Sequence, residues 1–155
     1  MTELIIFGAK YLVAAIMLCG AVTLAFAGER RRRFTYVLAI ALPLGYALAR
    51  LAGLFFAHNQ PFAVDGFEPL IPHSIDNSFP SDHVVIGGVF ASLAFLADRK
   101  VGLVLWALTL LVGLARMIAG LHWGVDIATA ALLALGAVFV ARKVVLWVRG
   151  RQLYP

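Results

Sequence analysis

The chain has 155 residues, of which 63% are hydrophobic and 14% charged, and its mean hydropathy is +0.94. Soluble domains are about half apolar and about a quarter charged, so this composition excludes an ordinary soluble domain and indicates an integral membrane protein. The length leaves room for one domain, residues 1–155. The single cysteine, Cys19, lies in an apolar run, which excludes a disulfide framework and a thiolate metal site.

Five apolar runs approach the length of roughly 20 residues that a membrane-spanning helix requires. They predict an all-α integral membrane bundle with about five transmembrane helices. In chain order the runs are residues 4–27, 34–57, 81–97, 101–121 and 123–141, and the third is short. The one long connection, residues 58–80, holds four of the six prolines, and a loop of this length is usually functional or disordered.

Ten of the thirteen lysines and arginines lie in the short links and the C-terminal tail. They are Arg30, Arg31, Arg32, Arg33, Arg99, Lys100, Arg142, Lys143, Arg149 and Arg151. Because short cytoplasmic loops are rich in Lys and Arg, this pattern predicts that the C-terminus is inside and the N-terminus outside. The four-arginine run could also bind nucleic acid or anionic lipid. Topology already accounts for it, so no nucleic-acid partner is expected.

The three remaining cations, Lys10, Arg50 and Arg116, fall inside or at the edge of apolar runs. A charge in the bilayer costs a few kcal/mol or more, so such residues normally face a partner or a cavity. With the predicted topology all three lie in the outer half of the bilayer. We expect them to form a pocket for a multiply charged anion, since planar guanidinium groups suit phosphate oxygens. For Lys10 the alternative is a side chain that snorkels to the interface.

A polar cluster, RMIAGLHWGVD, separates the last two apolar runs and contains Arg116, His122 and Asp126. Gly120 allows a turn, after which His122 opens the last helix, and Asp126 follows one helical turn later on the same face. A carboxylate there can orient one imidazole nitrogen and leave the other as a nucleophile, as in a catalytic triad. The alternative is a purely structural hydrogen-bonded pair.

A second polar stretch, SFPSDH, places Ser81 and His83 at the start of the third apolar run. His83 there can protonate a leaving oxygen and then activate water, or it can simply cap a helix. Ser81 and the free backbone N–H groups at the helix start can bind phosphate oxygens. His58 and His73 are expected to be solvated or to lie at the rim. The histidines offer no compact ligand set, so neither a metal site nor a cofactor is predicted.

These residues resemble the PAP2 (type 2 phosphatidic acid phosphatase) superfamily. PSDH, residues 80–83, is similar to its PSGH motif, and Arg116, His122 and Asp126 match its R-x5-H-x3-D motif. The first family motif, K-x6-R-P, is matched only in part: Gln60 replaces its arginine and Gly53 stands at its lysine position. The run LIPHSIDNSFPSDH resembles the branch of undecaprenyl-diphosphate phosphatases related to the bacitracin-resistance protein. The resemblance covers about residues 45–135.

The resemblance implies a metal-independent phosphatase that forms a phosphohistidine intermediate. It assigns His122 as nucleophile, Asp126 as its orienting group, His83 as general acid and base, and Arg116 as a phosphate ligand. Ser81, Arg50, Gln60 and Lys10 complete the expected phosphate site. Asp82 adds negative charge near an anionic substrate unless it points away or pairs with a cation, and Ala115 replaces a serine often found before the arginine.

The expected activity is hydrolysis of a polyprenyl diphosphate, most plainly undecaprenyl diphosphate, at the outer face of a bacterial inner membrane. The rival hypotheses are a phosphatase of phosphatidylglycerophosphate or phosphatidic acid, and a non-catalytic lipid-phosphate binder or transporter. The family core usually has six helices, and five are predicted here. The sixth is expected to be missing at the N-terminus, and a homodimer could cover the gap.

Overall fold

A computed structural model describes residues 1–152, with the side chains of residues 1–148. All regular elements of this range are helices, which confirms the predicted all-α fold. They are α1 (Thr2–Lys10), α2 (Leu12–Ala25), η1 (Gly28–Arg30), α3 (Arg31–Phe55), α4 (Pro61–Asp65), α5 (Asp82–Ala97), α6 (Arg99–Ile118) and α7 (Gly124–Gln152). Arg149 and Arg151, two of the cations used to predict the topology, lie outside the described side chains.

The five predicted spans appear as helical units, although two differ from a simple straight span. η1 with α3, α6, and residues 124–148 of α7 are each long and apolar enough to cross a membrane. The first predicted run is broken after Lys10, where α1 and α2 meet at a bend of 47° and count together as a fourth candidate span. α5 has 16 residues and is shorter than the others.

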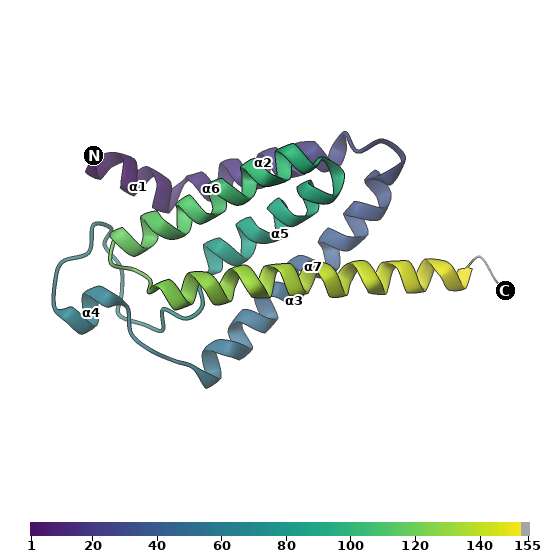
Figure 1. The fold of residues 1–155 in the computed structure, drawn as a ribbon. Coiled ribbons are helices and arrows are strands. Elements are labelled where there is room, and N and C mark those ends of the chain that lie inside the picture. Colours follow the sequence, from purple (N-terminus) through teal and green to yellow (C-terminus); the bar gives the residue numbers. More distant parts are fainter. Residues whose placement is uncertain (153–155) are drawn as a thin grey trace.

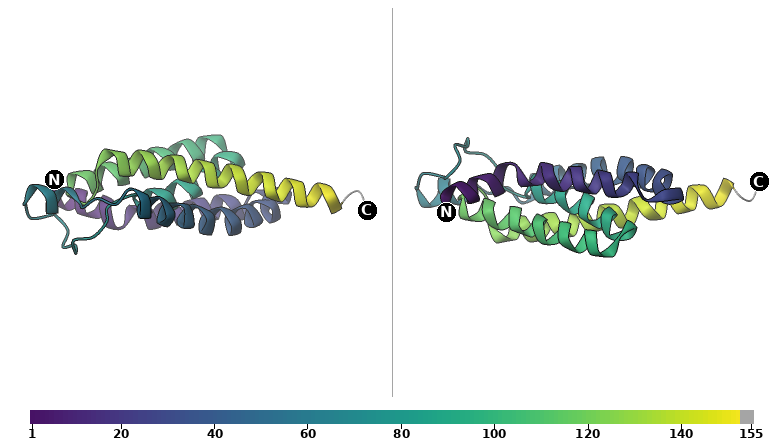
Figure 2. Two further views of the ribbon diagram at one scale, coloured as in Figure 1. Left: turned by 90° about the horizontal axis from the view of Figure 1, so that it is seen from below. Right: turned by 90° about the horizontal axis from the view of Figure 1, so that it is seen from above.

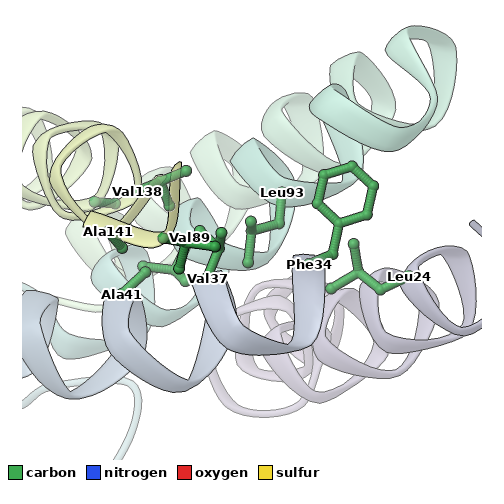
Figure 3. Packing of buried hydrophobic residues seen from close by; sticks show 10 residues of the cluster. Leu24, Phe34, Val37, Ala41, Val89, Leu93, Val138 and Ala141 are labelled. Atoms are coloured by element: carbon green, nitrogen blue, oxygen red, sulfur yellow. The ribbon is translucent and has the colours of Figure 1, made fainter. Parts of the chain in front are cut away.

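The short helix α5 lies at the centre of the bundle, in contact with α2, α3, α6 and α7. It can be surrounded because small residues let its neighbours approach closely. A Cβ atom added at Gly87 would lie 2.9 Å from Oγ1 of Thr109 on α6, and one added at Gly88 would lie 2.7 Å from Cβ of Ala134 on α7. Figure 3 shows the core cluster in which Val89 and Leu93 of α5 meet α2, α3 and α7.

The bundle is elongated, and different segments of the chain lie at its two ends (Figures 1 and 2). One end carries the N-terminus, the 58–80 connection with α4, and the turn between α6 and α7. The other end carries the link from α2 to α3, the link from α5 to α6, and the C-terminal part of α7. The links that carry Arg30 to Arg33 and Arg99 with Lys100 therefore lie at the same end of the bundle. Gly120 makes the α6–α7 turn with a φ of 81°, a backbone conformation that favours glycine.

Candidate active site

The carboxylate of Asp126 organises the start of α7. One of its oxygens, Oδ2, accepts a 2.9 Å hydrogen bond from the backbone N–H of Trp123, which precedes the helix, as the third residue of a capping box does. The same oxygen lies 3.3 Å from Nδ1 of His122. His122 lies in the connection before α7, so the prediction that it opens the helix is wrong. The contact forms because the chain turns back at Gly120 and Leu121.

The second oxygen of Asp126, Oδ1, accepts a 2.9 Å hydrogen bond from Nε2 of His58. Asp126 is fully buried, whereas the side chain of His58 is 36% exposed. His58 therefore lies at the rim, as expected, but it is bound to the site and is not simply solvated. The main chain of the long connection holds it there, because its carbonyl accepts a hydrogen bond from the backbone N–H of Ser78 at 2.9 Å.

Arg116 of α6 lies against His83 of α5 in the same region as the Asp126 carboxylate. Nη1 of Arg116 lies 3.4 Å from Nε2 of His83 and donates a 3.2 Å hydrogen bond to the carbonyl of Ala9 on α1. The Nε atom of Arg116 is buried and has no hydrogen-bond partner within the described residues. An arginine N–H can only donate, so this group lacks an acceptor among the described residues.

Arg50 of α3 forms an ion pair with Oδ1 of Asp82 at the start of α5. Its guanidinium also lies over the ring of Tyr46, 5.1 Å from the centroid. The sequence left open whether Asp82 would repel an anionic substrate. Its negative charge is offset by the positive charge of Arg50. Both side chains are partly exposed, at 50% and 39%, so the pair is open to solvent and exchange of partners.

Gln60 is buried and fixes the long connection. Its side-chain nitrogen donates to the carboxylate of Asp76 and to the carbonyl of Ser74, and its oxygen accepts from the backbone N–H of Asp76 at 3.1 Å. The surroundings of Gly53 leave no room for the side chain of the lysine that the family motif has at this position. A Cβ atom at Gly53 would lie 2.8 Å from the carbonyl oxygen of Phe79 and 3.0 Å from Nδ2 of Asn77.

These residues surround a cavity of about 200 Å³, which we call the polar cavity. Five of the predicted site residues line it: Arg50, Gln60, His83, Arg116 and His122. The long connection adds His73, Asp76, Asn77 and Ser78, which no periodic pattern in the sequence marks. Asp126 lies behind His122. Ser81 is fully buried, its Oγ has no partner within the described residues, and it does not line the polar cavity.

Lys10 does not join the other two cations. It is exposed at the break between α1 and α2 and is not among the described residues that line the polar cavity. The expected cluster of three cations is therefore a pair, Arg50 and Arg116. The reason is the bend after Lys10, which a continuous apolar run does not predict.

His122, which lies outside the helices, is kept neutral by its surroundings. Burial is the main cause that lowers the pKa of His122, and the nearby charge of Arg116 lowers it further, while the contacts with Asp126 act in the opposite direction. A neutral imidazole with its Nδ1 turned toward a carboxylate carries its proton on that nitrogen and its lone pair on Nε2. Among residues 1–152, no group of three or more His, Cys, Asp or Glu side chains is placed to hold a metal ion.

The polar cavity gathers three histidines and two arginines inside a helical bundle, an arrangement suited to binding a multiply charged anion. Comparison with known proteins identifies the class: a model of the PAP2 superfamily matches residues 34–149. The chain belongs to the PAP2 superfamily, and the resemblance seen in its motifs is confirmed.

Three known proteins illustrate the relationship. The chain is 39% identical over 103 residues to bacitracin transport permease protein BcrC of Bacillus licheniformis, covering 65% of this chain and 51% of that protein. It is 30% identical over 134 residues to undecaprenyl-diphosphatase BcrC of Bacillus subtilis, covering 86% of this chain and 69% of the relative. The chain thus spans about half the length of the first relative. The crystal structure of LpxE from Aquifex aeolicus shares the fold, with a TM-score of 0.65 at 20% identity, covering 91% of this chain and 93% of that one.

Proposed function

We propose that this protein is a lipid phosphatase that hydrolyses undecaprenyl diphosphate, or a closely similar polyprenyl diphosphate, to the monophosphate and inorganic phosphate. The observation that carries the proposal is the convergence of His83, His122 and Arg116 on one polar cavity. The names of the curated relatives add support for the diphosphate substrate.

His122 is the proposed nucleophile. Its Nε2 lone pair attacks the terminal phosphorus, and a nitrogen–phosphorus bond forms as the bond from phosphorus to the bridging oxygen breaks. Asp126 accepts the hydrogen bond from Nδ1 of His122 and stabilises the positive charge that develops on the ring. Arg116 binds the phosphoryl oxygens, through its unpartnered Nε and the N–H groups next to it.

His83 is the proposed general acid and base. It gives a proton to the bridging oxygen, so that the lipid leaves as a monophosphate. It then takes a proton from the water molecule that attacks the phosphohistidine, which breaks the nitrogen–phosphorus bond and releases inorganic phosphate. In this scheme Arg50 holds the outer phosphate oxygens, and Gln60 keeps the loop around the cavity in position.

An apolar groove beside the polar cavity supports a lipid as the substrate. The groove has a volume of about 500 Å³, and Arg50 and Asn77 line both spaces. Its other walls include Ala47, Leu51 and Leu54 of α3. A diphosphate in the polar cavity would therefore leave its hydrocarbon chain in this groove, facing the bilayer. Because the short links rich in Lys and Arg lie at the other end, we propose that this end of the bundle lies at the outer face of a bacterial inner membrane.

Phosphate release by purified protein from a panel of lipid phosphates tests the proposal. The panel consists of undecaprenyl diphosphate, phosphatidylglycerophosphate and phosphatidic acid. We expect the diphosphate to give the highest kcat/KM, His122→Ala to abolish release while the protein stays folded, and excess chelator to leave turnover unchanged. Preference for a glycerolipid would reassign the substrate. Tight binding without release from any lipid would favour a binder or transporter, and a strict magnesium requirement would contradict metal-free chemistry.

A further inference from the structure

Three arginines converge at the end of the bundle opposite the polar cavity. Arg30 of η1, Arg33 of α3 and Arg142 of α7 line a second cavity of about 110 Å³, which we call the arginine cavity. The other residues that line it are Phe34, Val37 and Leu96, so none is acidic. Arg142 follows Asp126 by sixteen residues along α7, which places the arginine cavity about 24 Å from the proposed catalytic site at a helical rise of 1.5 Å per residue.

The charges of these arginines are not neutralised by the protein. The guanidinium of Arg30 is held in place, because it donates to the carbonyls of Leu96 at 3.4 Å and Ala97 at 3.3 Å. Arg33 and Arg142 form neither a hydrogen bond nor an ion pair with any described side chain. The nearby Asp98 uses one carboxylate oxygen to accept the backbone N–H groups of Lys100 and Val101. The arginine cavity is therefore a cationic site with no acidic side chain on its lining.

An apolar groove leads away from the arginine cavity. Its volume is about 320 Å³, and it shares Leu96 and Arg142 with the arginine cavity. Its other walls include Phe95, Leu103, Trp106 and Phe139. The groove exists because α6 and α7 both pack on the central α5 and hardly touch each other. A cationic site that opens into a hydrocarbon-lined groove matches a molecule with a phosphate at one end and an acyl chain behind it.

We propose that an anionic phospholipid binds here, with its phosphate between Arg33 and Arg142 and one acyl chain in the groove of Phe95, Trp106 and Phe139. Arg30, fixed on the end of α5, adds charge to the phosphate site. The lipid belongs to the leaflet opposite the catalytic site, so it is neither substrate nor product. This inference does not depend on the proposed function.

Two arginines of the four-arginine run, Arg31 and Arg32, provide a control for the proposed lipid site. Arg31 and Arg32 are exposed and do not line the arginine cavity. Arg32 instead donates to the hydroxyl of Tyr36 at 3.2 Å and lies over its ring. If the arginines serve only to orient the protein in the membrane, all four should contribute alike. If they bind a lipid, only the arginines that line the arginine cavity should contribute. The double variants Arg33→Gln/Arg142→Gln and Arg31→Gln/Arg32→Gln remove the same charge and separate the two explanations.

Thermal unfolding of the purified protein in a neutral detergent, titrated with phosphatidylglycerol, tests the proposal. A ligand that binds only the folded state raises Tm as its concentration passes Kd. We expect phosphatidylglycerol to raise the Tm of the wild type and phosphatidylcholine not to do so. Any rise with inorganic phosphate, the product of the polar cavity, should be the same in Arg33→Gln/Arg142→Gln as in the wild type. Loss of two charge-assisted contacts should raise the midpoint lipid concentration by about tenfold or more in Arg33→Gln/Arg142→Gln. Arg31→Gln/Arg32→Gln should keep the wild-type midpoint, and both variants retain the polar cavity.

Occupation of the groove is tested separately with phosphatidylglycerol carrying brominated acyl chains. Substoichiometric lipid should quench tryptophan fluorescence in the wild type, and Trp106→Phe should lose most of that quenching. Equal shifts of the midpoint in the two double variants, an equal Tm response to phosphatidylcholine, or undiminished quenching in Trp106→Phe would each overturn the proposal. A Tm response to inorganic phosphate that Arg33→Gln/Arg142→Gln loses would show a site for free phosphate and would also overturn it. The Trp106→Phe comparison holds even if an arginine variant fails to fold.

Discussion

The Nε2 atom of His58 lies 2.9 Å from Oδ1 of Asp126, although the two residues are 68 positions apart. The other oxygen of this buried carboxylate lies 3.3 Å from Nδ1 of His122, so one carboxylate serves two imidazoles. The position of the Asp126 carboxylate decides the tautomer and direction of His122. His58 therefore acts on the proposed nucleophile through Asp126, as a positioning residue.

Replacement of His58 tests this relationship. His58→Ala removes one hydrogen bond to a charged carboxylate, worth about 1.5–3 kcal/mol. If half or more of that is felt in the transition state, kcat falls between about fourfold and about 150-fold. KM should change little because His58 does not line the polar cavity. Steady-state kinetics of phosphate release measure both quantities.

His58→Gln is the matched control, because its amide N–H can still donate to Asp126. It should recover part of the kcat lost in His58→Ala. A merely structural His58 predicts a different result: kcat would follow the fraction of folded protein, and the two variants would then differ only in Tm.

The ion pair between Arg50 and Asp82 predicts non-additive effects in a double-mutant cycle. In the wild type Arg50 neutralises Asp82, so Asp82→Asn should change kcat/KM by no more than a few fold, the scale of an exposed pair. Arg50→Gln removes a cation and leaves Asp82 to repel the anionic substrate, so kcat/KM should fall. In that background Asp82→Asn should raise kcat/KM. The cycle is measured with one lipid diphosphate, and purely additive effects would show that the pair is not coupled.

Gly53 predicts that restoring the lysine of the family motif is harmful. Gly53→Lys must place a Cβ 2.8 Å from the carbonyl oxygen of Phe79 and displace Asn77, whose side chain donates to the carbonyl of Gly53 at 3.0 Å. Overpacking of this kind costs about 1–3 kcal/mol of unfolding free energy. Gly53→Ala should show most of the same loss. Gly136→Ala in α7 is the control, because its added Cβ meets no atom within 4 Å and should not lower the stability.

Burial of His122 predicts how activity and stability depend on pH. Its pKa lies below the ordinary value of 6.5, mainly through burial, so the ring is neutral at pH 7 and the acid limb of kcat/KM should begin below pH 6.5. Below 6.5 the unfolded chain binds a proton at His122 more readily than the folded protein does. Stability therefore falls as pH decreases from 6.5 toward the folded-state pKa. His122→Gln should remove this part of the pH dependence of Tm, and a Tm profile identical to that of the wild type would contradict it.

Much of the architecture follows from local pattern. The apolar runs mark the helices because a bilayer requires continuous hydrocarbon contact, and the positions of Pro80 and Gly120 mark where α5 begins and where α6 turns into α7. The residue types of the site could also be predicted from the sequence, since His83, Arg116 and His122 interrupt segments that are otherwise apolar. The break after Lys10 was not readable, because the apolar run continues through it and no proline marks it.

Hydropathy and helix-end motifs were enough to predict a helical membrane bundle and the side chains able to carry phosphoryl chemistry, because both depend on neighbouring residues alone. The contact of His58 with Asp126, the ion pair of Arg50 with Asp82 and the position of Lys10 outside the polar cavity became visible in the folded chain. Each of these depends on how helices and loops pack in three dimensions. Contacts between segments 32 to 68 residues apart leave no periodic trace in a single chain.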